Sequence, residues 1–254
     1  MIKIIRTISA WKDIRNNELK AGDMLGFVPT MGALHEGHLS LIRQSKKDND
    51  KTVVSIFVNP TQFNDKKDLD KYPRNLEEDK IKLEAEGVDF LFIPKYENLY
   101  PDNYSYKICE NSLSTMLCGA TRIGHFDGVL TVVMKLLQII KPNKAYFGKK
   151  DYQQYLLIKK MAEAFFLDTK IIACPTVREK NGLAMSSRNL LLGPKEKKLA
   201  SHFNKLLKSR KSPQKIRRDL ISAGFVVDYI EEHFGRRFGA VKIGEVRLID
   251  NVKI

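Results

Sequence analysis

Two histidines three residues apart, His35 and His38, are the residues of this chain best suited to chemistry on a phosphate. They lie in segment 27–38, whose pattern indicates a buried strand, a turn containing Gly32 and the start of a helix. The spacing lets both imidazoles face the same side. A helix N-terminus also offers free backbone N–H groups and a partial positive charge to an anion. The context therefore favours a phosphate site.

Two other interpretations of the histidine pair stay open on spacing alone. A pair of this kind can bind a metal, although the sequence places no third ligand at zinc spacing nearby. The two histidines can also cap the helix for structural reasons only. Gly32 and Gly37 would permit close approach of the backbone to a nucleotide. The sequence contains neither the P-loop pattern GxxxxGK[ST] nor the dinucleotide pattern GxGxxG, so these two phosphate-binding loops are excluded.

Strand-like apolar runs alternate with helix-like periodic stretches over the first two thirds of the chain, which is typical of a parallel sheet covered by helices. The predicted strands are 24–29, 53–58, 88–93, 145–147 and 170–174, and the predicted helices are 38–47, 76–86, 125–140 and 151–165. Residues 94–106 are predicted to form a loop. This order places the phosphate site at the carboxyl ends of the strands.

The character of the chain changes after Pro175, where it becomes more basic and carries three short strand-like pieces, 224–229, 237–243 and 246–249. We therefore predict an α/β fold. A Rossmann-like parallel sheet with helices on both faces would occupy residues 1–175, and a smaller α+β C-terminal domain would occupy residues 176–254.

Composition narrows the class of protein. The 254 residues include 44 lysines and arginines against 30 acids, and the net charge of +14 suits nucleic acid, an anionic membrane or phosphorylated small molecules. The basic residues are scattered, and their clusters lack the interleaved aromatics of single-strand binders. No apolar run approaches the roughly 20 residues of a membrane span, and the N-terminus is too polar for a secretory signal. Three cysteines without a CxxC pair argue against a disulfide scaffold. We expect a cytoplasmic protein that binds neither membrane nor nucleic acid.

Four ordered segments carry a specific resemblance. They are PTMGALHEGHLSLI (29–42), SIFVNPTQF (55–63), AYFGKKDYQQ (145–154) and VREKNGLAMSSRN (177–189). The HxGH element resembles that of the nucleotidyltransferase superfamily, which includes the class I aminoacyl-tRNA synthetases. Together the segments resemble the pantothenate synthetase (pantoate–β-alanine ligase) family. The resemblance implies that ATP and (R)-pantoate form pantoyl adenylate and pyrophosphate, and that β-alanine then displaces AMP to give pantothenate.

The resemblance also implies which residues bind ATP. They are Met31, Gly32, Ala33, Leu34, His35, Glu36, Gly37, His38, Gly148, Lys149, Lys150, Asp151, Val177, Met185, Ser186, Ser187 and Arg188. His38 is the implied proton donor, and His35, Lys150 and Arg188 are the other implied catalytic residues. Their types suit a reaction in which negative charge builds on the α-phosphate and the departing pyrophosphate. Mg²⁺ is implied as a companion of ATP, with no metal ligand assigned in the chain.

Two glutamines match substrate positions of the family. Gln62 is implied to contact both pantoate and β-alanine, and Gln154 to contact pantoate. A neutral amide can bind the pantoate hydroxyls without pairing with the carboxylate, which must stay nucleophilic. Either residue could otherwise be an ordinary surface glutamine.

The chain departs from the family at Lys149, where a glutamate is common, and we interpret Lys150 as the catalytic lysine and Lys149 as peripheral. The acidic run 77–79 could assist a magnesium ion, but acids in the first turn of a helix more often complement its dipole, so it stays unassigned. His125 also stays without a role. The resemblance implies a homodimer. Two alternatives remain: another HxGH nucleotidyltransferase, and a basic nucleic-acid-binding module related to synthetase domains.

Overall fold

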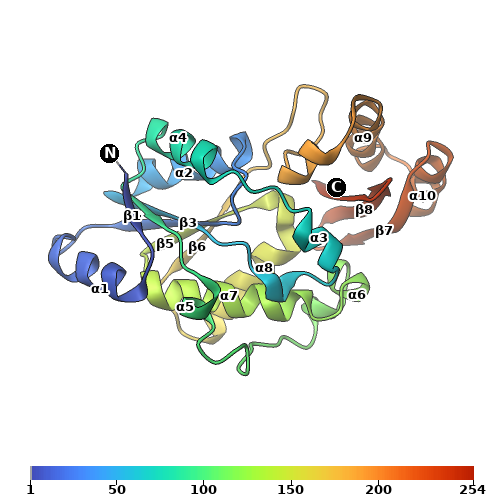
Figure 1. Ribbon diagram of the computed structural model, residues 1–254. Coiled ribbons are helices and arrows are strands. Elements are labelled where there is room, and N and C mark those ends of the chain that lie inside the picture. The colour runs from blue at the N-terminus through green and yellow to red at the C-terminus, as the bar shows by residue number, and fades with distance from the viewer. Residues whose placement is uncertain (1) are drawn as a thin grey trace.

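The computed structural model describes residues 2–254 and contains two sheets of different kinds (Figure 1). The first is a parallel sheet of six strands in the order β1-β4-β3-β2-β5-β6. Its strands are β1 Lys3–Ile5, β2 Leu25–Thr30, β3 Lys51–Ile56, β4 Phe90–Phe92, β5 Lys144–Gly148 and β6 Lys170–Cys174. The second sheet is antiparallel and consists of β7 Val226–His233, β8 Arg236–Ile243 and β9 Val246–Lys253. The predicted α/β class with a smaller α+β part is confirmed.

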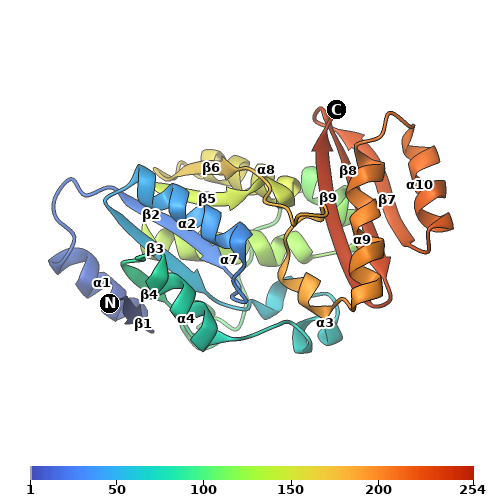
Figure 2. The same cartoon turned by 90° about the horizontal axis from the view of Figure 1, so that it is seen from above.

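Helices cover both faces of the parallel sheet (Figures 1 and 2). One face carries α2 Glu36–Asp48 and α4 Leu76–Ala85, and the other carries α1 Ile8–Asn17, α7 His125–Ile140 and α8 Tyr152–Ala164. Side chains of a strand point alternately to the two faces. Phe27 accordingly packs in the core with α7, while Val28 packs in the core with α2. This burial on both sides explains why the predicted strands are apolar nearly throughout.

The remaining helices are short or belong to the C-terminal part. They are α3 Lys66–Asp70, α5 Tyr96–Leu99, α6 Cys118–Thr121, α9 Pro194–Leu207 and α10 Pro213–Ser222. The prediction of an unbroken loop over 94–106 was wrong, because α5 forms one turn inside it. Helices α9 and α10 were not predicted. Their basic residues surround the apolar stripe that packs on the antiparallel sheet, including Phe203, Leu207 and Ile216. Other boundaries agree well: α7 and β6 match the predicted ranges.

The order of the strands fixes where a ligand can bind. From β2 the chain crosses to β3 on one side and later returns to β5 on the other side. Such a switch point leaves a crevice at the carboxyl ends of the strands, where no connection crosses over. The loops that leave β2, β3, β5 and β6 at this edge are the four segments singled out in the sequence.

The antiparallel sheet lies beside this edge, with α9 and α10 on its far side (Figure 2). The two sheets fall on either side of residues 174–176, but Tyr229, Phe238 and Ala240 of the second sheet join the core of the first part. The division into domains 1–175 and 176–254 therefore stays a prediction. No helix within residues 2–254 has both the length and the hydropathy to cross a bilayer.

Candidate active site

A cavity of about 310 Å³ lies where the strand-end loops meet the antiparallel sheet. Most of the residues that sequence reasoning assigned to the site line it: Met31, His35, Gly37, His38, Gln62, Gly148, Lys150, Asp151, Gln154, Val177, Met185, Ser186, Ser187 and Arg188. Five do not: Gly32, Ala33, Leu34, Glu36 and Lys149. The cavity thus brings together groups that are up to 157 positions apart in the sequence, from Met31 to Arg188.

The two histidines stand at the start of α2, with ring centroids 4.0 Å apart. Nδ1 of His35 accepts the backbone N–H of Gly37 at 3.1 Å, and Nδ1 of His38 accepts the backbone N–H of His35 at 3.3 Å. These bonds cap the helix, as one of the open interpretations held. They also fix the tautomers, because each neutral ring then carries its proton on Nε2 and can donate it to a ligand.

Burial keeps both imidazoles uncharged at neutral pH. It lowers the pKa of His35 to about 4, with the positive charge of Lys150 as the next cause. It also holds the pKa of His38 well below 6.5, with His35 and Lys150 as further causes. In the ligand-free protein the pair therefore offers hydrogen-bond donors, while Lys150 supplies the positive charge.

Gly37 is needed for the shape of this capped turn. A Cβ atom at this position would lie 2.8 Å from Cε1 of His35 and 2.9 Å from its Nδ1. The glycine thus allows the His35 ring to fold over the first turn of α2. Gly37 was expected to allow the close approach of a nucleotide, and the structure shows that the His35 ring already requires a glycine here.

Asp79 of α4 anchors the turn that precedes the histidines. Its carboxylate is 1% exposed and accepts the backbone N–H groups of Ala33 at 2.8 Å and Leu34 at 2.7 Å. The backbone here is unusual, because Gly32 and Ala33 both have positive φ, 78° and 49°. Two charge-assisted bonds hold this conformation. Asp79 was one of three acids left unassigned, and nothing in the sequence separates it from Glu77 and Glu78, which are exposed.

Gln62 follows β3 in a short 3₁₀ turn, Pro60–Gln62, and its amide is oriented by Asn59. Nδ2 of Asn59 donates to Oε1 of Gln62 at 3.2 Å and to the carbonyl of Gly128 at 3.1 Å. Asn59 is 1% exposed, so this arrangement is well fixed. Gly128 lets α7 approach, since a Cβ there would lie 2.3 Å from the carbonyl oxygen of Thr61. Gln62 is therefore no ordinary surface residue.

Gln154 and its neighbour Gln153 have different surroundings. The amide of Gln153 is buried, donates to the carbonyls of Leu113 and Met116, and accepts the N–H of Cys118. This residue holds the segment before α7. Gln154 lines the cavity and is only half-buried. Its amide is thus accessible for a ligand.

The lysine loop, Gly148–Asp151, is held from the C-terminal part. Nδ2 of Asn251 donates to the carbonyls of Lys149 and Lys150 at 2.9 and 2.8 Å. Lys150 lines the cavity with Nζ 3.3 Å from Oδ1 of Asp151, whereas Lys149 lines a second, more open depression together with Lys208 and Lys253. The two adjacent lysines therefore serve different surfaces.

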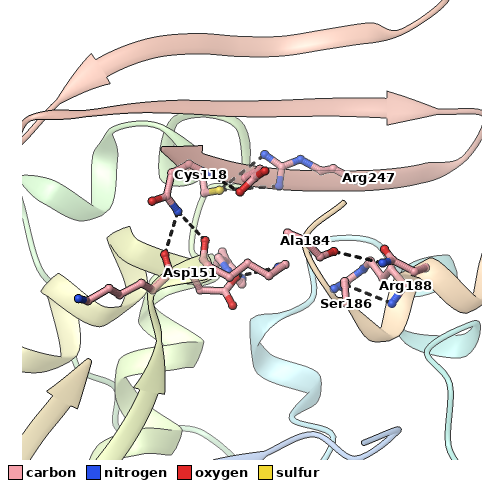
Figure 3. Close-up of polar contacts among 12 residues, drawn as sticks. Cys118, Asp151, Ala184, Ser186, Arg188 and Arg247 are labelled. Atoms are coloured by element: carbon pink, nitrogen blue, oxygen red, sulfur yellow. Dashed lines mark hydrogen bonds and ion pairs between the residues drawn. The ribbon is translucent and has the colours of Figure 1, made fainter. Parts of the chain in front are cut away.

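The segment 185–188 crosses from the C-terminal part to the turn before α2. Oγ of Ser187 donates to the carbonyl of Ala33 at 3.0 Å. The Arg188 guanidinium pairs with Asp68 at 2.9 Å and lies over the ring of Tyr72. Figure 3 shows this loop on one side of the site and Arg247 of β9, with Cys118, on another.

Several residues that line the cavity were missed by the sequence analysis: Asn59, Asp68, Tyr72, Arg122 and Arg247. His125, which had no assigned role, also lines it. Asp68 lies on α3, Arg247 on β9 and His125 on α7, and the others lie in loops. No local pattern at these places distinguishes a site residue from a packing residue. Within residues 2–254 no group of three or more His, Cys, Asp or Glu side chains is arranged to hold a metal ion.

Two neutral histidine donors at a helix start, a lysine and two glutamine amides line one cavity, and this set suits an enzyme that acts on the phosphates of a nucleotide. The model of the pantoate-beta-alanine ligase family matches residues 3–253, and the chain belongs to this family. It condenses pantoate with β-alanine at the expense of ATP. The function alternatives left open by the sequence are thereby set aside.

Named relatives match over their whole length. Pantothenate synthetase of Bdellovibrio bacteriovorus is 53% identical over 254 residues, 100% of both chains, and that of Legionella pneumophila is 50% identical, covering 98% of this chain and 99% of its own. A crystal structure of pantoate-beta-alanine ligase from Francisella tularensis, complexed with beta-gamma ATP and β-alanine, superimposes with a TM-score of 0.95. It is 44% identical and covers 100% of this chain and 98% of its own. Pantothenate synthetase from Thermus thermophilus gives a TM-score of 0.89 at 36% identity, with 99% of each chain covered.

Proposed function

We propose that the condensation runs through pantoyl adenylate. A carboxylate oxygen of pantoate attacks the α-phosphorus of ATP, and pyrophosphate leaves. The neutral amine of β-alanine then attacks the acyl carbon, the C–O bond to AMP breaks, and the nitrogen loses a proton to solvent as the amide forms. A carboxylate is already a nucleophile, so the first step needs no general base. The observation that carries this proposal is the single cavity that joins neutral histidine donors, Lys150 and the two glutamines.

ATP is proposed to lie along the turn before α2, the lysine loop and segment 185–188. Lys150 and the Nε2–H groups of His35 and His38 would meet the charge that develops on the phosphates. We propose that His38 is the proton donor of this site. It would donate through Nε2–H, because its Nδ1 already accepts the N–H of His35. Nε and Nη2 of Arg188 donate to Asp68, and the three other N–H donors of this guanidinium are left to meet a phosphate.

Pantoate is proposed to bind between Gln62 and Gln154, and β-alanine beside Gln62. The Francisella relative was crystallised with an ATP analogue and β-alanine, and we propose that both kinds of ligand bind here at the corresponding positions. Asn59 supports the proposal for Gln62, because it fixes Oε1 as the acceptor. Nε2 of Gln62 donates to Sδ of Met31 at 3.1 Å, and its second N–H is left for a hydroxyl or carboxylate.

Mg²⁺ is proposed to enter with ATP. Proteins usually hold this ion through substrate phosphates together with one or two carboxylates. Asp151 supplies such a carboxylate in the cavity, 41% exposed and next to Lys150, so the residues present fit the ion. When bound, Mg²⁺ would neutralise part of the phosphate charge. A homodimer, a cytoplasmic location and the absence of nucleic-acid binding stay predictions, and sedimentation analysis tests the first.

Isotope exchange tests the adenylate. With ATP, Mg²⁺, pantoate and labelled pyrophosphate, the protein should return label to ATP in the absence of β-alanine. His38→Ala should reduce this exchange severely, while Lys80→Ala, on the surface of α4, should leave it unchanged. Release of ADP instead of AMP, or exchange that requires β-alanine, would contradict the proposal.

A further inference from the structure

Arg122 lines the cavity, and none of the roles proposed above involves it. It precedes α7 and lines the cavity beside Gln62. Its Nη2 donates to the backbone carbonyl of Gln62 at 3.2 Å, and its Nη1 contacts Nε2 of His125 at 3.0 Å. A guanidinium has five N–H donors, so three remain for another partner.

The charges around Arg122 do not balance. Two other guanidiniums lie close to it, and each has an acid: Arg188 pairs with Asp68, and Arg247 pairs with Asp228. In the part of the chain that the structure describes, no carboxylate lies within 4.0 Å of Arg122. Burial, followed by repulsion from Arg247 and Arg188, lowers its pKa to about 10, so it remains charged at neutral pH. An unpaired, partly buried cation in a cavity calls for an anionic ligand.

His125 determines how the guanidinium is held. Its Nδ1 lies 2.7 Å from the carbonyl oxygen of Gln62, which can only accept, so Nδ1 carries the proton. Nε2 must then accept from Arg122, and the ring is neutral. Burial and the nearby Arg122 agree with this assignment, since they lower the pKa of His125 to about 3. Arg122, His125 and the Gln62 carbonyl form a closed triangle of hydrogen bonds, which gives the guanidinium one fixed orientation.

The reaction presents two carboxylates, and they have different fates. The pantoate carboxylate becomes the acyl group, and it must approach the phosphates near His38 and Lys150. The β-alanine carboxylate remains ionised from binding to product release. A fixed cation suits this second group, because an ion pair with the nucleophilic carboxylate of pantoate would oppose its attack on phosphorus.

We propose that Arg122 binds the carboxylate of β-alanine and that His125 acts as its positioning residue. This inference rests on the proposed function, because it assigns the second substrate to the Gln62 end of the same cavity. Arg122 then determines specificity: amines that lack a carboxylate at the distance found in β-alanine are poor substrates, since they leave the guanidinium buried and unpaired.

The test compares β-alanine with 3-aminopropanamide, which has the same length and an uncharged end. For Arg122→Gln we expect kcat/KM for β-alanine to fall about 100-fold, and the preference for β-alanine over the amide to shrink by a similar factor. Pyrophosphate exchange with pantoate alone should fall by far less, about threefold. Arg43→Gln removes an equal charge from a surface ion pair on α2 and should change neither quantity.

The two half-reactions keep failures distinguishable. Absence of pyrophosphate exchange in the unsubstituted protein would overturn the adenylate mechanism. An unchanged preference for β-alanine over the amide in Arg122→Gln would overturn only the role of Arg122. An Arg122→Gln variant that loses exchange as fully as β-alanine transfer would also contradict it. Arg122→Lys keeps the charge without the planar fork, and we expect it to recover part of the amine preference.

The role of His125 is tested by comparing changes in KM with changes in kcat. His125→Ala should raise KM for β-alanine about tenfold with a smaller change in kcat, because Arg122 then loses its fixed orientation. His125→Asn, whose amide can still donate to the Gln62 carbonyl, should recover part of the loss. If His125→Ala and His125→Asn each impaired pyrophosphate exchange as strongly as they raised KM for β-alanine, the role of His125 would be structural only.

Discussion

Replacing Asp79 should separate the anchor of the phosphate turn from its acidic neighbours. The carboxylate accepts two backbone N–H groups at 2.7 and 2.8 Å in a buried position, and bonds to a charged acceptor contribute about 1.5–3 kcal/mol each. In Asp79→Asn one oxygen still accepts, but an NH₂ group faces the other N–H. The loss of one bond is partly offset, since burial raises the pKa of Asp79 and removing the charge removes that desolvation cost. We expect a net loss of about 2 kcal/mol in the free energy of unfolding.

Urea denaturation followed by the fluorescence of Trp11, the sole tryptophan and fully buried, measures this loss. Glu77→Gln is the matched control, because Glu77 lies two residues earlier on α4, is 78% exposed and pairs with Lys80 at the surface. Its effect should stay below about 0.5 kcal/mol. Pyrophosphate exchange should fall at least tenfold in Asp79→Asn, because the turn at Ala33 loses its support. Equal stability of the two variants would refute the reasoning.

Three further predictions concern charge. Lys150→Ala should lower the exchange rate by about 100-fold or more, because it removes a cation from the cavity. Lys149→Glu should change the rate less than about threefold, because Lys149 lies in the other depression. Equal losses in the two variants would show that the assignment of Lys150 to the site is wrong. The free energy of unfolding, measured without ligands, should fall as the pH drops from 6.5 toward 4. The pKa values of His35, His38 and His125 are lowered in the folded chain, so the unfolded chain binds more protons in this range. Denaturation at pH 7.5, 6 and 5 measures this decline, and His125→Asn should make it less steep. RNA binding, measured by filter retention, should be weak and vanish by about 0.2 M salt if the charge of +14 serves small anions, and nanomolar affinity at that salt would contradict this.

Periodicity and motif spacing predicted the framework well, because burial on both faces leaves a strong signal. Strand β6 and helix α7 were located to the residue, and the loop after β2 was found from its glycines and histidines. The loops after β3, β5 and β6 were singled out by the resemblance to the family. Elements that rely on tertiary packing were not found. Strand β1 has three residues, two of them exposed, and it exists only because β4 supplies its partner. Helices α9 and α10 carry apolar stripes diluted by lysines, which a composition-based interpretation takes for a basic tail.

The site shows the same limit at the level of single residues. His35 and His38 stood out by their spacing at a helix start, and Lys150 and Gln62 were brought forward by the resemblance to the family. Arg122 and Asp79 have no such pattern: one is an arginine in a loop and the other an acid in an acidic helix. What distinguishes them is a buried charge and the partner that it has or lacks. Asp79 has two backbone donors, so it stabilises a turn, whereas Arg122 keeps three donors free in the cavity. The same physical quantity, an ionised group removed from water, thus indicates structure where its hydrogen bonds are filled and substrate binding where they are open.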